Sequence, residues 1–287
     1  MYPRNSITVP EAENSITLPL IVLPEIHAEY GLNLHDEVAK EGYQIYDFFL
    51  PGLMIHTLEK GSNIALLKWA TEIKEKGYQT VNMLGCHDGI PVLDLKGKEA
   101  NGAYHKGLLT DEEIEFVMET ILERGGKVKN LYDATGNKIS YYQINATFFS
   151  ALGENENKLV LARALQLFMP GIPQVWYLDL FAGKNNNEAA NKGGSSSHKE
   201  INRTSLNVSE IENGLKRKVV ANQLQLMRLR NTSKAFLGKM TIHDSLEKEI
   251  SISWTNENCI AKLEANLIDF SFKVSHSEND ISTELIF

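Results

Sequence analysis

The sequence predicts an α/β fold in which part of a (β/α)8 barrel precedes a small antiparallel β domain. Between residues 20 and 234, short apolar segments alternate four times with stretches of helical periodicity. Such alternation gives a parallel sheet covered by helices, with the site at the carboxyl ends of its strands. From Ala235 onward, apolar residues recur at every second position, which is typical of antiparallel strands. Four strand and helix units are half of the eight that close a barrel.

Residues 1–19 are expected to form an irregular leader and not a domain. Asn5–Pro10 is nearly repeated as Asn14–Pro19, and prolines at positions 3, 10 and 19 block a helix. The first predicted strand, Leu20–Leu23, is an aliphatic run that ends at Pro24-Glu25-Ile26-His27. A carboxylate and a histidine therefore follow this strand directly.

The next elements follow from the spacing of the apolar residues. Helical spacing predicts helices at Asn33–Glu41, Leu53–Lys60 and Ile64–Lys76. Gln44–Leu50, ended by Pro51, and Tyr78–Leu84 are apolar runs that are too short for stable helices. Both runs are therefore predicted to be strands.

A long connection, residues 89–140, follows the Tyr78–Leu84 strand and is predicted to be mostly loop. Its one clear helix, Asp111–Arg124, is opened by Thr110 as the cap and by Asp111 as a first-turn acid. A connection of this length after a strand usually marks a site or a lid.

Helical spacing resumes after this connection and ends at Pro170-Gly171. The predicted helices are Tyr141–Leu152, Lys158–Phe168 and Leu215–Arg230, the last with a basic final turn that suits the helix dipole. Ile172–Leu180 is predicted to be a strand, and residues 183–203, rich in Asn, Gly and Ser, a loop. The β domain, residues 235–287, is predicted to contain strands at Ile250–Trp254, Ile260–Leu267, Phe270–Phe272 and Leu285–Phe287.

The composition excludes several classes of protein. The net charge of -8 and the pI near 5.6 leave no basic stripe for nucleic acid. No stretch approaches the ~20 apolar residues of a membrane span. Cys86 and Cys259 lie far apart, with no CxxC motif and no secretory leader before them, so we expect free thiols in a reducing cytoplasm.

Glu25 and Asp88 each follow a predicted strand, and each stands beside a histidine, His27 or His87. In a barrel both carboxyls would lie at the same rim, where paired carboxylates suit glycoside chemistry. Metal binding by these four residues is the competing use, but no HExxH or comparable ligand spacing supports it. Taken alone, Asp88-Gly89 also has the composition of an ordinary turn.

Several motifs occur in the order found in one family. They are Leu-Pro-Glu25-Ile-His27, Cys-His87-Asp88-Gly-Ile, Tyr-Tyr-Gln143-Ile-Asn-Ala-Thr-Phe-Phe-Ser-Ala-Leu-Gly, Met-Pro-Gly-Ile-Pro-Gln-Val-Trp-Tyr and Glu-Ile-Asn-Arg203. From about residue 20 to about 237, the chain resembles the sucrose phosphorylase group of the α-amylase superfamily. The resemblance implies strands 5 to 8, the carboxyl half of the barrel, over residues 20–234. It also implies a retaining, double-displacement transfer of glucose from an α-glucoside to phosphate, with no cofactor and no metal.

The resemblance also implies roles for individual residues. Glu25 matches the general acid/base and Asp88 the transition-state stabiliser. The remaining positions match residues that bind the substrate: His27 and His87 at the glucose and acceptor subsites, Arg203 at the glucosyl unit, and Tyr142 and Gln143 in the acceptor loop. A developing oxocarbenium ion favours a nearby anion, and sugar hydroxyls favour forked donors, so these residue types suit those roles.

The chain departs from the family in one respect that concerns catalysis. The family's nucleophile is an aspartate in an Arg-x-Asp motif, and no Arg-x-Asp occurs in this sequence. We therefore expect the carboxyl half of an enzyme, from a truncated, split or degenerate gene, that is inactive and poorly soluble alone. The expected partners are a complementary amino-terminal half or a second copy of the chain. A non-catalytic subunit that binds carbohydrate or completes an enzyme is the alternative.

The identity of the donor stays open at this level. Where sucrose phosphorylases have Asp-Leu-Tyr-Gln in the acceptor loop, this chain has Ser140-Tyr141-Tyr142-Gln143. Where they have Gly-Arg-Asp before Ile-Asn-Arg, this chain has Ser-His198-Lys199-Glu200, which looks more like the relatives that act on glucosylglycerate. His198 and Lys199 would suit a carboxylate or a phosphate on the substrate. Sucrose, a phosphorylated disaccharide and glucosylglycerate are therefore rival donors.

Overall fold

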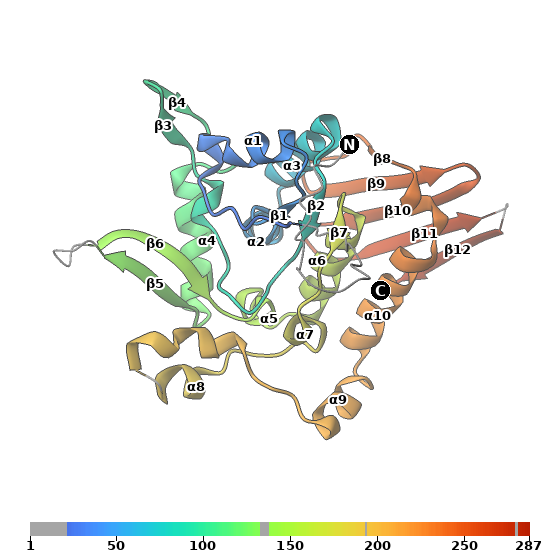
Figure 1. Cartoon of the computed structure of the whole chain (residues 1–287). Coiled ribbons are helices and arrows are strands. Elements are labelled where there is room, and N and C mark those ends of the chain that lie inside the picture. Colours follow the sequence, from blue (N-terminus) through green and yellow to red (C-terminus); the bar gives the residue numbers. More distant parts are fainter. Residues whose placement is uncertain (1–21, 133–137, 193, 279–280) are drawn as a thin grey trace, which may run out of the picture.

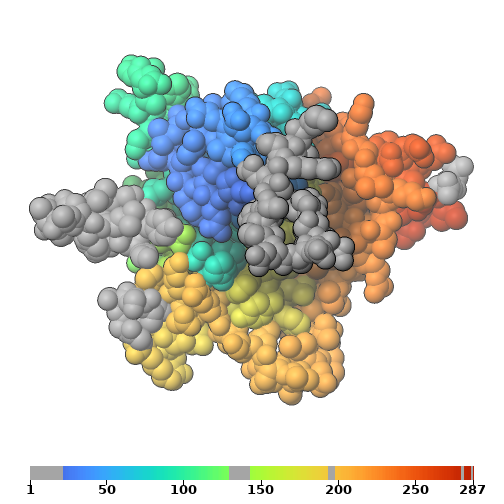
Figure 2. All heavy atoms as spheres, viewed as in Figure 1, coloured from blue at the N-terminus to red at the C-terminus, as the bar shows by residue number. Residues whose placement is uncertain are grey.

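The structure of the protein is a computed structural model that describes residues 22–132, 138–192, 194–278 and 281–287. The leader predicted at residues 1–19 and the first half of the predicted Leu20–Leu23 strand lie outside the described residues. Figure 1 shows a small central sheet surrounded by helices and a larger sheet beside it. In Figure 2 the C-terminal residues, orange to red, gather on one side of the molecule.

The central sheet is parallel, as predicted, and its strand order is β1-β2-β7. These strands are β1 (Ile45–Asp47), β2 (Thr80–Asn82) and β7 (Ile172–Pro173). All three are shorter than predicted. β1 ends early because Asp47 Oδ1 accepts a hydrogen bond from the Leu50 amide at 3.0 Å, which turns the chain into the next helix. Pro51 then stands in the first helical turn, where its missing N–H costs nothing.

The strand predicted at Leu20–Leu23 is not present over Val22 and Leu23. The described segment 22–29 is irregular, and no strand of the described residues pairs with the outer edge of β1. Pro24 has no N–H to donate to a ladder, which disfavours regular pairing at this point. Glu25 and His27 therefore stand on irregular backbone, and side-chain contacts with Phe48 and Asp94 hold His27.

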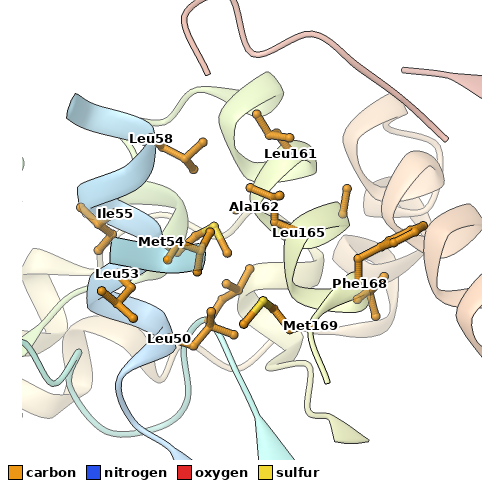
Figure 3. Packing of buried hydrophobic residues seen from close by; sticks show 14 of the residues in the cluster. Leu50, Leu53, Met54, Ile55, Leu58, Leu161, Ala162, Leu165, Phe168 and Met169 are labelled. Atoms are coloured by element: carbon orange, nitrogen blue, oxygen red, sulfur yellow. The ribbon is translucent and has the colours of Figure 1, made fainter. Parts of the chain in front are cut away.

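Five predicted helices are confirmed, with small changes at their ends. They are α1 (Leu34–Lys40), α2 (Leu50–Lys60), α3 (Ile64–Lys76), α4 (Asp111–Glu123) and α6 (Glu156–Phe168). Thr110 and Glu113 form a reciprocal capping box at the start of α4. Figure 3 shows the core between α2 and α6, where Leu50, Met54 and Leu58 face Leu161 and Leu165.

The helix predicted at Tyr141–Leu152 is wrong in its first half. That part belongs to β6 (Lys138–Asn145), which pairs antiparallel with β5 (Lys127–Tyr132) and continues into the short helix α5 (Phe148–Ala151). Aromatic and β-branched residues favour a strand once a partner strand is available, and β5 supplies the partner. The same stretch had the apolar spacing of a helix, so tertiary pairing overrode the local pattern.

Other connections also contain more structure than expected. The strand predicted at Ile172–Leu180 ends at Pro173 and is followed by α7 (Tyr177–Leu180). The predicted loops contain the hairpin β3 (Lys98–Ala100) and β4 (Ala103–His105), the helix α8 (Asn187–Lys192) and the 3-10 segments η2 (Leu93–Leu95) and η3 (Gly194–Asn202). The predicted Leu215–Arg230 helix is present as α10 (Lys218–Thr232), and a helix that was not predicted, α9 (Val208–Gly214), precedes it. Two further 3-10 turns are η1 (Tyr30–Leu32) and η4 (Lys234–Leu237).

The C-terminal antiparallel sheet is confirmed, with strand order β12-β11-β10-β9-β8. Its strands are β8 (Lys239–Ile242), β9 (Glu249–Asn256), β10 (Cys259–Asn266), β11 (Phe272–Glu278) and β12 (Ile281–Ile286). Burial alternates along β10, with Ala261 and Leu263 fully buried, which is the period-two pattern of a sheet with one covered face. Trp254 donates to the Phe168 carbonyl at 2.8 Å and so joins this sheet to α6.

A buried carboxylate, Asp47, anchors the aromatic part of the core. The Trp69 indole N–H lies 3.0 Å from both oxygens of Asp47, and both residues have no exposed surface. Burial raises the pKa of Asp47 to about 6, although the hydrogen bonds from Trp69 and the backbone oppose that rise.

We predict that Asp47→Asn becomes progressively more stable than the wild type as the pH rises. The folded pKa of Asp47 is raised, so its contribution to stability is present below the unfolded pKa and lost as the pH rises through about 6. The difference in unfolding free energy should change by about 3 kcal/mol between about pH 4 and about pH 7. Urea unfolding of both proteins across this range measures it, and a constant difference would contradict the prediction.

Candidate functional site

A cavity at the carboxyl end of β2 brings together most of the residues that the sequence singled out. Glu25, His27, His87, Asp88 and Gln143 all line it. The remaining wall is mostly apolar or aromatic and comes from β1, the start of α2 and the β2 end, with Tyr46, Phe48, Pro51, Met83, Leu84, Gly85, Cys86, Gly89, Pro91 and Gln174. Two carboxylates, two imidazoles and two amides thus converge on one small concave site.

Side chains of neighbouring segments hold the turn that carries His87 and Asp88 through hydrogen bonds to its backbone. Asn202 is 1% exposed, and its side-chain amide donates to the carbonyls of Cys86 and Asp88, each at 2.8 Å. The Arg203 Nε donates to the His87 carbonyl at 2.8 Å. On the other side, the Gly89 amide donates to the Gln143 Oε1 at 3.1 Å. The end of η3 and strand β6 therefore fix the turn from opposite sides.

Asp88 is surrounded by cationic groups. The Lys199 Nζ contacts Asp88 Oδ1, while Arg203 Nη2 and His87 Nε2 each lie 3.5 Å from the carboxylate. Partial burial raises the pKa of Asp88, but the Lys199 hydrogen bond and the charges of Lys199, His87 and Arg203 outweigh it. The net effect is a pKa below the ordinary value, so Asp88 is ionised at neutral pH.

We predict that Lys199→Met raises the pKa of Asp88. Lys199 makes the largest of the contributions that lower this pKa, and methionine keeps the length of the side chain without its charge. Carbon-detected NMR titration of the Asp88 carboxyl measures the shift, with Lys192→Met on the exposed face of α8 as the matched control. An unchanged Asp88 titration in Lys199→Met would show that Lys199 does not stabilise the carboxylate.

Glu25 and His27 reach the cavity from the irregular segment 22–29. The His27 ring stacks on Phe48 with 4.0 Å between ring centroids, and its Nδ1 lies 3.2 Å from Asp94 Oδ2. Burial raises the pKa of Asp94, and His27 opposes the rise. Glu25 is exposed at the cavity rim. A stacked, hydrogen-bonded histidine beside an accessible carboxylate is thus held without regular backbone structure.

Among the other predicted site residues, none whose side chain the structure describes lines the cavity, and they differ in whether they contact a residue that does. Lys199 and Arg203 reach the site through Asp88, whereas His198 lies in η3 and is absent from the cavity wall. Tyr142 belongs to β6, but its side chain lies outside the described part of the chain. Together with Gln143, it stands on a strand where a helix was predicted.

Sequence reasoning missed Asn202 and Asp94. Asn202 lies inside the Ile-Asn-Arg motif, so its place between two motif residues was a signal of its role. Asp94 had no comparable signal, because its contact with His27 joins residues 67 positions apart.

The described residues contain no cluster of three or more His, Cys, Asp or Glu side chains arranged to hold a metal ion. In the same part of the chain, no helix combines the length and the apolar character needed to cross a membrane.

No protein-family model matches the chain. Among curated proteins, it is 52% identical over 267 residues to the sucrose 6(F)-phosphate phosphorylase of Ilumatobacter coccineus, covering 93% of this chain and 50% of that protein. It is 36% identical to the sucrose phosphorylase of Streptococcus mutans, covering 92% of this chain and 52% of the relative. The glucosylglycerate phosphorylase of Escherichia coli is more distant, at 29% identity over 60% of this chain and 30% of that protein. The chain thus spans about half the length of the curated relatives that it matches most fully.

Comparison with solved structures points to the same group of proteins. The sucrose 6F-phosphate phosphorylase from Thermoanaerobacter thermosaccharolyticum superimposes with a TM-score of 0.81 at 31% identity, covering 93% of this chain and 52% of that chain. An α-amylase from H. orenii gives a TM-score of 0.54 at 15% identity over 90% of this chain, which is a likeness of fold alone.

Proposed function

We propose, from the premise that this chain is a homologue of the sucrose phosphorylases, that it supplies half of the active site of a glycoside phosphorylase. The reaction is the transfer of glucose from an α-glucoside to inorganic phosphate with retention of configuration. The observation that carries the proposal is the single cavity lined by Glu25, His27, His87, Asp88 and Gln143. Residues 20–234 are proposed as the carboxyl half of a (β/α)8 barrel, and residues 235–287 as a C-terminal β domain.

The proposed roles follow from where charge develops. Glu25, exposed at the rim, gives a proton to the oxygen of the departing group as the glycosidic bond breaks. Asp88, kept ionised by its cationic neighbours, stabilises the oxocarbenium-like transition state. His27 and His87 contact the glucose and acceptor groups, and Arg203 binds glucosyl hydroxyls. Phosphate then attacks the anomeric carbon of the covalent glucosyl intermediate, the enzyme nucleophile leaves, and Glu25 acts as the base, so that glucose 1-phosphate is released.

The covalent step needs a nucleophile that this sequence does not contain in the family's Arg-x-Asp form. Removal of a nucleophile that acts as part of a catalytic unit lowers the rate by many orders of magnitude. We therefore propose that the polypeptide alone is inactive and works with a complementary half. The outer edge of β1, which no described strand pairs, would accept the neighbouring strand of that half.

The proposed donors are sucrose or its 6(F)-phosphate, with glucosylglycerate as the second candidate. Lys199 and His198 would bind a phosphate or a carboxylate on the acceptor side, with Tyr142 and Gln143 on strand β6. The relatives named for sucrose and sucrose phosphate are more similar to this chain than those named for glucosylglycerate. Cys86 and Cys259 are free thiols, which suits a cytoplasmic reaction.

The test is phosphorolysis by the chain alone and by the chain combined with the portion of the Ilumatobacter relative that it does not match. Sucrose, sucrose 6'-phosphate and glucosylglycerate are offered separately, and glucose 1-phosphate is measured. We expect product only from the combined protein. Normal turnover by the chain alone would refute the need for a second half. A stable combined protein without activity would favour a non-catalytic role, for which the absent Arg-x-Asp motif is the supporting observation.

A further inference from the structure

A buried carboxylate that no motif singled out, Asp179 on α7, lies directly beneath the turn of the proposed site. It is 1% exposed, and its Oδ1 accepts a hydrogen bond from the Phe148 amide at 3.3 Å. A Cβ placed on Gly85 would lie 2.6 Å from Asp179 Oδ2, so the carboxylate packs directly on the Gly85 backbone. Gly85 is the residue before Cys86-His87-Asp88. Asp179 therefore contacts the base of the turn and the start of α5 together.

The absence of a side chain at Gly85 is required by this packing. Any substituted residue would place its Cβ within 3.3 Å of three atoms of the Asp179 carboxylate group. The glycine thus lets the backbone of the turn approach the carboxylate closely. A turn whose position depends on such a contact moves when the carboxylate is removed.

Arg163 on α6 lies near enough for its positive charge to oppose the rise in the pKa of Asp179 that burial causes, although the two side chains form no salt bridge. Arg163 is completely buried, its Nε donates to Gln223 Oε1 at 3.0 Å, and it also contacts Gln166. Gln166 donates to the carbonyls of Asn82 at 3.2 Å and Gln174 at 2.9 Å, which lie at the ends of β2 and β7. The buried polar groups thus join the helices behind the sheet to the strand ends that carry the cavity.

Stability alone does not account for two buried charges of this kind. Two buried opposite charges cost desolvation energy that their attraction repays only in part, and apolar replacements are often as stable. The location of Asp179 against Gly85 and Phe148 favours a role in fixing the position of the backbone at these two residues. The segments that it holds are those that carry Asp88 and, through β6, Gln143.

We infer that Asp179, with Arg163 as its counter-charge, is a positioning residue that holds the Gly85–Gly89 turn in place for the site. The effect on catalysis rests on the proposed function, whereas the effect on the turn does not. Asp179 acts through the backbone of the turn and touches no substrate.

The test uses the charge-balanced double variant Asp179→Asn/Arg163→Met in the full chain. Removing both charges avoids an unpaired buried ion, so the fold is expected to survive. The asparagine can keep the bond from Phe148, but its NH2 group would then take the place of the carboxylate Oδ2 against Gly85. We expect hydrogen exchange at residues 85–89 to become about tenfold faster, while exchange in α2 and α3 stays unchanged.

Glu59→Gln is the matched control, because Glu59 is a part-buried carboxylate that pairs with Arg124 and Lys158 away from the site. It should destabilise the chain without changing exchange at residues 85–89. Unchanged exchange at these residues in the double variant, or the same acceleration in Glu59→Gln, would overturn the inference.

A second measurement separates this inference from the proposed function. In the combined protein, the double variant should lower kcat more than it raises KM, because a displaced Asp88 loses its effect in the transition state. If the unmodified combined protein is inactive, the proposed function fails, and hydrogen exchange alone decides the role of Asp179. If it is active and the double variant keeps the full kcat, the positioning role fails.

Discussion

Replacing Asp88 by asparagine in the combined protein should lower kcat by about 10³-fold. The substitution keeps the shape of the side chain and removes the negative charge that would face the oxocarbenium-like transition state. Lys199 and Arg203 would then flank a neutral group, and their charges would oppose the developing positive charge of the sugar. Steady-state phosphorolysis of the preferred donor measures the loss.

The matched control for this prediction is Asp111→Asn. Asp111 is an exposed first-turn residue of α4 that lies 3.3 Å from Lys96, well outside the site. Its replacement should leave kcat within about twofold, since exposed ion pairs contribute little. If Asp88→Asn retained near-normal turnover while remaining folded, the stabilising role of Asp88 would be wrong.

Replacing Trp69 by alanine should destabilise the fold by about 3–5 kcal/mol, the largest expected effect of a single core substitution in this chain. Trp69 has no exposed surface and packs edge-on against Phe49, with ring centroids 4.9 Å apart. The rings of Tyr30, His35 and Tyr78 also contact it. The substitution also removes the indole donor of the buried Asp47, which then keeps only its backbone donors, and the lost hydrogen bond adds to the cost.

Urea unfolding followed by far-UV circular dichroism measures this change. Ile64→Ala on the same helix is the control, because Ile64 is 62% exposed and its truncation should cost less than about 0.5 kcal/mol. The loss of unfolding free energy in Trp69→Phe should lie between the losses in these two variants, because phenylalanine keeps most of the packing but cannot donate the hydrogen bond. Similar midpoints for Trp69→Ala and Ile64→Ala would contradict the role of Trp69 in the core.

Local sequence patterns predicted the elements that their own residues stabilise. The α4 helix begins at the predicted cap because Thr110 and Glu113 satisfy its first amides without help from the rest of the chain. The C-terminal strands follow from period-two burial, as along β10. The residues of the candidate site were predicted because Glu25, His27, His87 and Asp88 stand in motifs, and these four residues do line one cavity.

Tertiary contacts decided the remaining structure. The stretch from Tyr141 has helical spacing but forms part of β6, because β5 offers a partner strand whose hydrogen bonds outweigh a weak local preference. Asn202 holds the turn from more than a hundred positions away in the sequence, at separations of 114 and 116 residues. No local pattern can encode a contact of that kind.

The sequence by itself therefore determined the alternation of strands and helices, the helix caps, the C-terminal sheet and the identity of the charged residues at the site. Only the tertiary structure decided how these residues are used. It placed cationic side chains around Asp88, Phe48 against His27, and the buried Asp179 beneath Gly85. The physical reason is that caps and periodicity act within a few residues, whereas desolvation and charge pairing depend on which distant segments pack together.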